Sequence, residues 1–252
     1  MIRFIRRIRH QLLDSGRITR YLAYAGGEII LVVIGILIAL QINNWNESRK
    51  DRKSEVQILS AILENLSEDK ANLNISINSF ETNKRYIARF YETPRLPDDS
   101  VAYLFTQAYL INDFRPIQSA YELSISSGKM DLIRDKKLTQ MIQRLYTLDY
   151  EADAINLEIL KEYHTQMRHL TDRYDALDFG EIRGGVDLGL RSMQMPFNNE
   201  NVWKVLSDKE AIRMNKQYRF NLNMIVALYR GMLASRDQVE LAIKQYLSTR
   251  KI

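Results

Sequence analysis

Cysteine is absent from this sequence of 252 residues, which excludes disulfide bonds, thiolate metal sites and cysteine nucleophiles. Histidine is scarce, with three residues in all. His164 and His169 lie about 140° apart around a helix, so they cannot share a metal ion without a second segment. The sequence has no Glu-x-x-His motif of the di-iron bundles and no Gly-x-Ser-x-Gly nucleophile elbow. We therefore expect no catalytic residue, no metal site and no bound cofactor.

The stretch "SSGKM" at residues 126–130 ends like a phosphate-binding loop. It lacks the upstream glycine of that motif, has no Ser or Thr after Lys129 and follows no predicted strand. The pattern instead predicts the C-terminal end of a helix, with Gly128 as the residue just beyond it.

Positive charge is concentrated near the N-terminus. Residues 1–27 hold six arginines and one acid, whereas the other 225 residues carry 30 basic and 30 acidic side chains. The net charge of +5 therefore reports a basic tail, residues 1–20, and not a nucleic-acid-binding surface. The tail predicts either an amphipathic helix on anionic headgroups or only a signal for membrane topology. Its arginines are Arg3, Arg6, Arg7, Arg9, Arg17 and Arg20.

A long apolar run occupies residues 21–45. Ile29–Leu40 holds ten Ile, Leu or Val in twelve residues, which favours membrane insertion by roughly 3–6 kcal/mol. A bilayer needs about 20 residues, so the span must include its flanks, with Tyr24 and Trp45 near the two interfaces. No small-x-small cleavage pattern follows the run, so we expect a permanent transmembrane helix. The arginine excess before it predicts a cytoplasmic tail and an external domain, residues 46–252.

One face of this span carries Glu28, Gly35 and Ala39, which lie within about 20° of one line along the helix. Gly35 and Ala39 form a small-xxx-small pair that lets two helices approach closely, and a carboxylate on that face is better placed between helices than against lipid. The pattern predicts a packing face for a homo-oligomer or a membrane-protein partner. Alternatively, Glu28 only marks the membrane interface and the small pair arose by chance. A proton site is disfavoured because Glu28 is shallow.

Residues 46–252 read as helix, with no alternating strand pattern. The first helix continues from the span to about Tyr91, with an apolar residue at every seventh position, as in a coiled-coil seam. These residues are Leu59, Leu66, Leu73, Phe80 and Ile87. The expected companion row consists of Val56, Leu63, Ile77 and Tyr91, interrupted by Lys70 and Lys84.

Further helices are expected at about 100–111, from Ser119 as cap to Gly128, at about 135–177, and to about Ser248 after a Ser207–Glu210 capping box. The last has apolar residues at exact sevens from Ala211 to Tyr246, with Leu222, Tyr229 and Ile243 beside them. Residues 178–200 hold four glycines and predict a long loop. The fold class is all-α, with one N-terminal transmembrane helix followed by an elongated antiparallel helical bundle with long helices.

The stretch "SAYELSISSGKMDLIRDKKL", residues 119–138, predicts a tight corner between two helices. One interpretation is that the corner caps the bundle. The other is a docking corner for a partner, which would use Arg115, Tyr121 and the serines around Gly128.

Two stretches resemble a known family. "GEIILVVIGILIALQINNWNE" (residues 27–47) is similar to the signature span of an uncharacterised, domain-of-unknown-function family of single-pass membrane proteins of Bacteroidota, and residues 119–138 are similar to its second recurring block. The resemblance covers the tail, the span and the middle of the chain. It implies a bacterial inner membrane with the C-terminal domain in the periplasm, and it implies no activity.

These features predict a non-enzymatic, membrane-anchored periplasmic scaffold or adaptor. The expected partners are the lipid bilayer and a second copy or another membrane protein, with no nucleic acid. One alternative is a ligand-sensing or signalling module, which would need a separate output partner because the tail is short. Another is an enzyme with a site in the glycine-rich loop. The sequence does not identify a small-molecule ligand.

Overall fold

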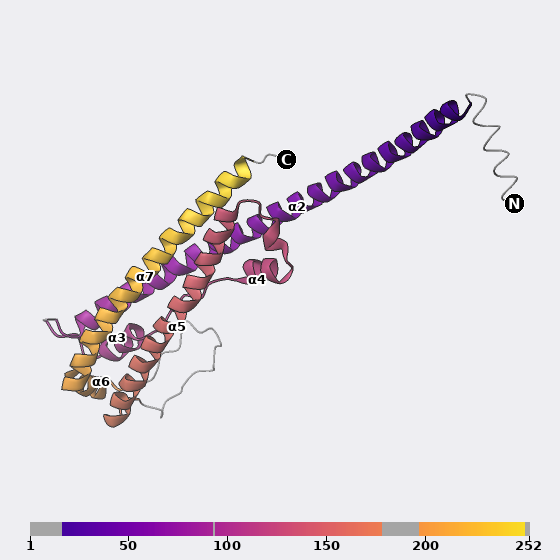
Figure 1. The fold of residues 1–252 in the computed structure, drawn as a ribbon. Helices are drawn as coiled ribbons and strands as arrows, with labels where there is room; N and C mark the ends of the chain where they lie inside the picture. Colours follow the sequence, from indigo (N-terminus) through magenta and orange to yellow (C-terminus); the bar gives the residue numbers. More distant parts are fainter. Residues whose placement is uncertain (1–16, 93, 178–196, 250–252) are drawn as a thin grey trace, which may run out of the picture. The chain divides into compact units, whose positions relative to one another are not determined.

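The computed structural model describes residues 17–92, 94–177 and 197–249. All of the elements in these ranges are helical, and the ranges hold no strand, only an isolated antiparallel bridge between Leu177 and Phe197. The elements are α2 (Arg17–Arg89), α3 (Val101–Ala108), α4 (Ser119–Ser126), the 3₁₀ helix η1 (Lys129–Leu132), α5 (Lys136–Arg173), α6 (Asn199–Ser207) and α7 (Lys209–Ser248) (Figure 1). The chain divides into two compact units, residues 1–55 and residues 56–252, and each is considered by itself.

The first unit contains the beginning of α2. Its large aliphatic side chains from Ile29 to Leu40 are all exposed, by between 47% at Val33 and 73% at Leu31. In the described part of the chain, α2 is the helix that is long and apolar enough to cross a membrane by length and composition. The predicted apolar helix is therefore present. The predicted fold of tail residues 1–16 lies outside the described residues.

In the second unit, the part of α2 beyond residue 55 packs against α7 in the antiparallel direction. Lys70 contacts Asp237, and further along α2 Glu81 contacts Arg230. The third long helix, α5, joins them through two hydrophobic clusters, in which residues of α2 meet residues of α5 and α7. One cluster is centred on aromatic residues near the α3 and α6 end, and the other includes Leu59, Ile142 and Ile243.

The predicted seven-residue row of α2 is confirmed, because Leu59, Leu66, Leu73, Phe80 and Ile87 are completely buried. The predicted companion row is confirmed at Ile77 and in part at Leu63, which is half-buried against a hydrophobic cluster, but Val56 is only half-buried and Tyr91 is 42% exposed. The second buried row instead consists of Ile62, Asp69, Ser76, Asn83 and Phe90, none more than 5% exposed. Three of these five residues are polar, so apolar periodicity could not reveal the row.

Two of the predicted N-cap residues are wrong. Asp208, and not Ser207, caps α7, since its carboxylate accepts a hydrogen bond from the backbone N–H of Glu210. Ser119 is the first residue of α4, its N-cap is Gln118, and no side-chain cap bond forms there. The second long helix begins where it was expected, and Asp135 caps α5 by accepting from the N–H groups of Lys137 and Leu138.

The predicted corner at Gly128 is confirmed as a local structure, because Gly128 has a φ of 67° just beyond the end of α4. Sequence reasoning missed α6, which begins at Asn199 inside the loop expected at 178–200. Asn198 caps this helix by accepting from the N–H of Asn201. Residues 178–196 of that loop lie outside the described residues.

Candidate functional site

A buried ion pair joins α2 to α7. The guanidinium of Arg236 donates from Nε and Nη2 to Oδ2 of Asp69, at 3.0 and 2.9 Å, and both side chains are 0% exposed. Arg236 also donates to the carbonyl of Met232 and lies 4.9 Å from the centre of the Phe114 ring. Oδ1 of Asp69 accepts the backbone N–H of Ile117 at 2.9 Å. The pair therefore fixes the segment before α4 as well as the two long helices.

The ion pair of Asp69 and Arg236 is suited to a structural role. Burial raises the pKa of Asp69 above its usual value, and the hydrogen bonds from Ile117 and Arg236 oppose that rise. Arginine does not lose its proton in proteins, so Arg236 is not suited to move a proton at neutral pH. What the arrangement can do is hold α2 and α7 in one register.

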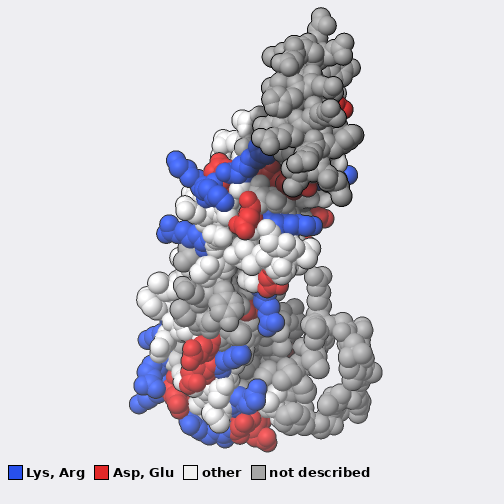
Figure 2. Space-filling model, turned by 45° about the vertical axis from the view of Figure 1, so that its right-hand side comes forward, with Lys and Arg blue, Asp and Glu red and all other residues white. Residues whose placement is uncertain are grey.

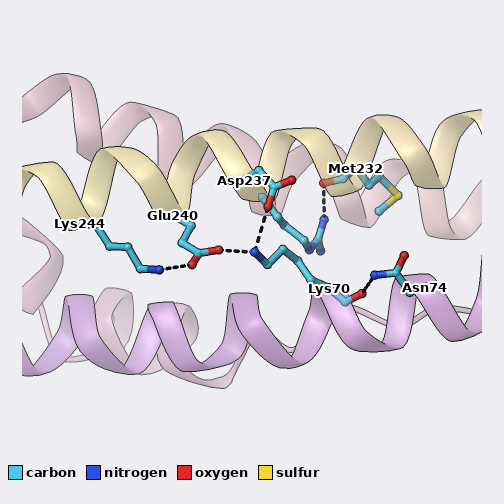
Figure 3. Close-up of polar contacts among 7 residues, drawn as sticks. Lys70, Asn74, Met232, Asp237, Glu240 and Lys244 are labelled. Atoms are coloured by element: carbon cyan, nitrogen blue, oxygen red, sulfur yellow. Dashed lines mark hydrogen bonds and ion pairs between the residues drawn. The ribbon is translucent and has the colours of Figure 1, made fainter.

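A more exposed charge network lies beside this pair (Figure 3). It begins at the next residue of each helix, Lys70 on α2 and Asp237 on α7. Nζ of Lys70 on α2 contacts Oδ1 of Asp237 at 2.9 Å and the carboxylate of Glu240 on α7. Glu240 also contacts Lys244, one turn further along α7. Hydrogen bonds from Lys244 and Lys70 lower the pKa of Glu240, and those to Glu240 and Asp237 raise the pKa of Lys70. Lys70, which interrupted the expected seam, is thus paired.

The network predicts a pH dependence of stability. Because the folded pKa of Glu240 lies below its unfolded value of 4.5, its contribution is present above 4.5 and is lost as the pH falls through the folded value. Lys70 contributes to stability below pH 10.5, the pKa of the unfolded state, and this contribution is lost as the pH rises through its higher folded pKa. We expect Glu240→Gln to lower the free energy of unfolding by about 0.5–1 kcal/mol at neutral pH. At a pH far under 4.5 the same substitution should have a smaller effect. Urea unfolding at the two pH values measures this. Glu64→Gln, at an exposed carboxylate of α2, should show no such difference.

A second polar centre lies inside the aromatic cluster. Oδ1 of Asn215, on α7, accepts from the hydroxyls of Tyr109 and Tyr163, both at 2.7 Å. Its Nδ2 donates to the hydroxyl of Tyr91 at 2.8 Å. The rings of Tyr163 and Tyr218 stack at 3.7 Å between centroids. Asn215 thereby connects α7 to α5 and to the residues just beyond the ends of α2 and α3 through one side chain.

Burial raises the pKa of the Tyr109, Tyr163 and Tyr218 hydroxyls. All three therefore stay protonated near neutral pH and cannot serve as general bases there. In the described residues, no group of three or more His, Asp or Glu side chains is placed to hold a metal ion. The centre, like the ion pair, is suited to positioning helices.

A cavity of about 220 Å³ opens beside this centre, between α3 and α5. Its walls include Phe105, Tyr109, Met167 and Phe197. Nε2 of His164 is buried with no hydrogen-bond partner in the described part of the chain, and burial lowers the pKa of this imidazole. The cavity is mostly apolar, but threonine hydroxyls and the side chain of Arg168 also line it, a combination suited to binding.

The residues predicted for the membrane face are exposed within the single chain. Glu28, Gly35 and Ala39 are all exposed, and a Cβ at Gly35 would meet nothing within 4 Å. Of the tail arginines, Arg3, Arg6, Arg7 and Arg9 lie outside the described residues, while Arg17 and Arg20 fall in α2. On the face drawn in Figure 2, Lys and Arg are interspersed with Asp and Glu and form no large patch of one sign among the described residues.

The residues of the predicted docking corner differ in how far they are available to a partner. Arg115 is exposed, and a Cβ at Gly128 would meet nothing nearby. Tyr121 instead stacks on Tyr146 at 4.4 Å between ring centroids and packs against a hydrophobic cluster. Tyr121 therefore helps to attach α4 to α5, and the docking role stays a prediction.

Sequence reasoning missed the two polar centres, although a signal for them exists. Asn215 and Arg236 fall in the same seven-residue series as Leu222, Tyr229 and Ile243, all of them buried. A polar residue at a core position of a heptad series commonly fixes register. Only the three apolar members of the series indicated a core face, so the polar members were passed over.

The arrangement defines an all-helical protein with a long apolar N-terminal helix and buried polar centres inside its second unit. The chain belongs to a family of unknown function, DUF6090, whose model matches residues 28–168. The expected resemblance to a family of unknown function is confirmed. The expected occurrence in Bacteroidota stays a prediction.

A protein named as a nucleotide-binding protein, from Photobacterium profundum, is 33% identical to the chain over 67 residues. These residues make up 26% of this chain and 42% of that protein, so the chain spans less than half of this relative's length. No solved structure matches the chain.

Proposed function

We propose that the protein is a non-enzymatic, membrane-anchored scaffold or adaptor of the bacterial inner membrane. Residues 21–45 span the bilayer, residues 1–20 lie in the cytoplasm, and residues 46–252 form an elongated helical bundle in the periplasm. The observation that carries the proposal is the contrast between the units. The second unit buries its long apolar rows, whereas the large aliphatic side chains of Ile29–Leu40 are at least 47% exposed over three turns of helix. Lipid is the surrounding that suits such a segment.

The polar centres support a structural role over an enzymatic one. Asp69–Arg236 and Asn215 use their hydrogen-bonding groups on partners within the fold, which leaves few groups free to act on a substrate. Association with a second copy or another envelope protein would use the face of Glu28, Gly35 and Ala39. The open space at Gly35 is what close packing of a second helix requires.

The experiment combines fractionation with cross-linking. We expect the full chain to stay in the membrane fraction after a carbonate wash, and a reporter at its C-terminus to be periplasmic. Because the chain has no cysteine, Ala39→Cys provides a single site for disulfide cross-linking. Cross-linking at this site should trap a second copy or a partner, and Gly35→Leu should abolish it. Recovery of a soluble protein would refute the anchor, and an uncross-linked Ala39→Cys chain would refute the packing face.

A ligand-sensing role is the second candidate, favoured by the cavity beside His164. At about 220 Å³ it is smaller than most drug-sized ligand sites, so it suits only a small, largely apolar molecule with a few hydrogen-bonding groups. Nucleotide binding is not part of the proposal. The similarity to the Photobacterium protein covers 26% of this chain, and "SSGKM" forms a helix end instead of a phosphate-binding loop.

A further inference from the structure

One face of α7 leaves a row of apolar side chains uncovered. Phe220, Met224 and Leu228 follow one another at four-residue intervals, and they are 63%, 60% and 38% exposed. The second unit otherwise places the residues of the α7 seven-residue series in its core. A contiguous exposed row of this kind is typical of an interaction surface.

The edge of this row that faces α2 is basic. Arg230 lies on this edge, since it contacts Glu81 of α2 at 3.2 Å. At about 100° per residue, Arg219 lies within 20° of Arg230 and Lys216 within about 40° of it. Between Glu210 and Asp237, α7 contains no acidic residue. Neither Lys216 nor Arg219 forms an ion pair with the described residues.

The edge that faces α5 is acidic. An open groove of about 670 Å³ runs between α5 and α7 on this side, and Gln217 and Asn221 form part of its α7 wall. Glu158 and Glu162 line the α5 wall together with Lys161, so the charge of this wall is negative overall. Both carboxylates are exposed, and neither forms an ion pair in the described part of the chain. The antiparallel packing of α5 on α7, with Tyr163 against Asn215, places these acids at the level of Lys216 and Arg219.

We propose that this face binds the same face of a second copy, with the two α7 helices parallel. A two-fold axis along α7 brings the basic edge of each copy opposite the acidic edge of the other. Lys216 of one copy then faces Glu162 of the other, twice over, with Met224 near the axis. Antiparallel pairing would place basic edges together and acidic edges together, which is repulsive. The chain thus supplies both halves of a complementary interface.

The inference rests on the proposed function in one respect. The proposed anchor would hold two copies in one membrane. It also raises the effective concentration of one copy near another, so a modest apolar row can support association. The charges at the edges decide orientation and partner choice more than affinity.

The test uses the full chain in native membranes, with two epitope tags to distinguish the copies. Met224→Cys supplies a single cysteine near the axis, and Asn78→Cys, at an exposed position of α2, is the matched control. Under mild oxidation we expect Met224→Cys to form a dimer of two tagged copies and Asn78→Cys to form none. In the Met224→Cys background, Lys216→Glu alone and Glu162→Lys alone should each reduce the cross-link about tenfold, because each creates two like-charge contacts.

Mixing the two charge-reversed chains should restore the cross-link between differently tagged copies, since both contacts are then attractive. Three outcomes would overturn the inference: equal cross-linking at Met224 and Asn78, no restoration in the mixture, or a cross-link from Met224 to a different protein. Cross-linking at Ala39 is scored separately. A membrane anchor that fails is therefore distinguishable from an α7 face that fails.

Discussion

Replacing Arg236 by methionine is expected to lower the free energy of unfolding of the helical unit by about 3–5 kcal/mol. The substitution keeps an apolar stem of similar length but leaves the Asp69 carboxylate buried without its cation. Asp69 is 0% exposed and retains only the N–H of Ile117 among the hydrogen bonds described for it. For a unit of this size, the loss corresponds to a fall of about 6–20 °C in Tm. Thermal unfolding followed by circular dichroism measures it.

The double variant Asp69→Leu/Arg236→Met provides the control. Removing both charges leaves no uncompensated ion, so its stability should return to within about 1–2 kcal/mol of the original protein or exceed it. Because burial raises the pKa of Asp69, its protonation should also reduce the cost of Arg236→Met at acidic pH. A single variant that unfolds like the original protein would contradict the role assigned to the pair.

Replacing Asn215 by leucine is expected to lower the free energy of unfolding by about 2–6 kcal/mol, because two buried tyrosine hydroxyls lose their acceptor at roughly 1–3 kcal/mol each. Tyr109 and Tyr163 are at most 9% exposed, so water cannot readily replace the amide. Tyr91 is 42% exposed and should find water, so it adds little. Denaturant unfolding measures the loss, with an unchanged slope showing that the folded state stays compact.

The triple variant Tyr109→Phe/Tyr163→Phe/Asn215→Leu tests the cause of that loss. It removes the hydroxyls together with their acceptor, so the cost should fall well below that of Asn215→Leu alone. If the triple variant were less stable than Asn215→Leu, the loss of stability would come from altered packing of the rings and not from hydroxyls left without a hydrogen-bond acceptor. Tyr218→Phe is a matched control, because the Tyr218 hydroxyl is buried with no partner in the described residues and its removal should cost little.

The sequence was sufficient for the long helices because their apolar residues recur with the helical period. The Leu59 to Ile87 row and the Ala211 to Tyr246 series both predict buried faces, and all but Tyr246 of these residues are buried. It was not sufficient for the second row of α2. Asp69, Ser76 and Asn83 are polar and buried, and the partners of Asp69 and Asn83 lie far away in the sequence, as Leu110 does for Asn83.

The caps show a similar limit. Ser207 and Asp208 are both good N-cap residues, so composition alone could not choose between them. Asp208 is selected because its carboxylate accepts from the hydroxyl of Tyr174, at the end of α5, as well as from the N–H of Glu210. Likewise, α6 is only nine residues long, too short for a periodic pattern to distinguish it from the loop before it.

The buried pair of Asp69 and Arg236 has a mechanical consequence. Sliding α7 along α2 by one helical turn, about 5.4 Å, would part the two charges inside an apolar interior. It would simultaneously draw Lys70 away from Asp237 and Glu240, since Lys70 directly follows Asp69 and Asp237 directly follows Arg236. The buried pair and the Lys70 contacts therefore both oppose sliding of α7 along α2. Under a force applied along the helices, the two helices should keep their register until these contacts break.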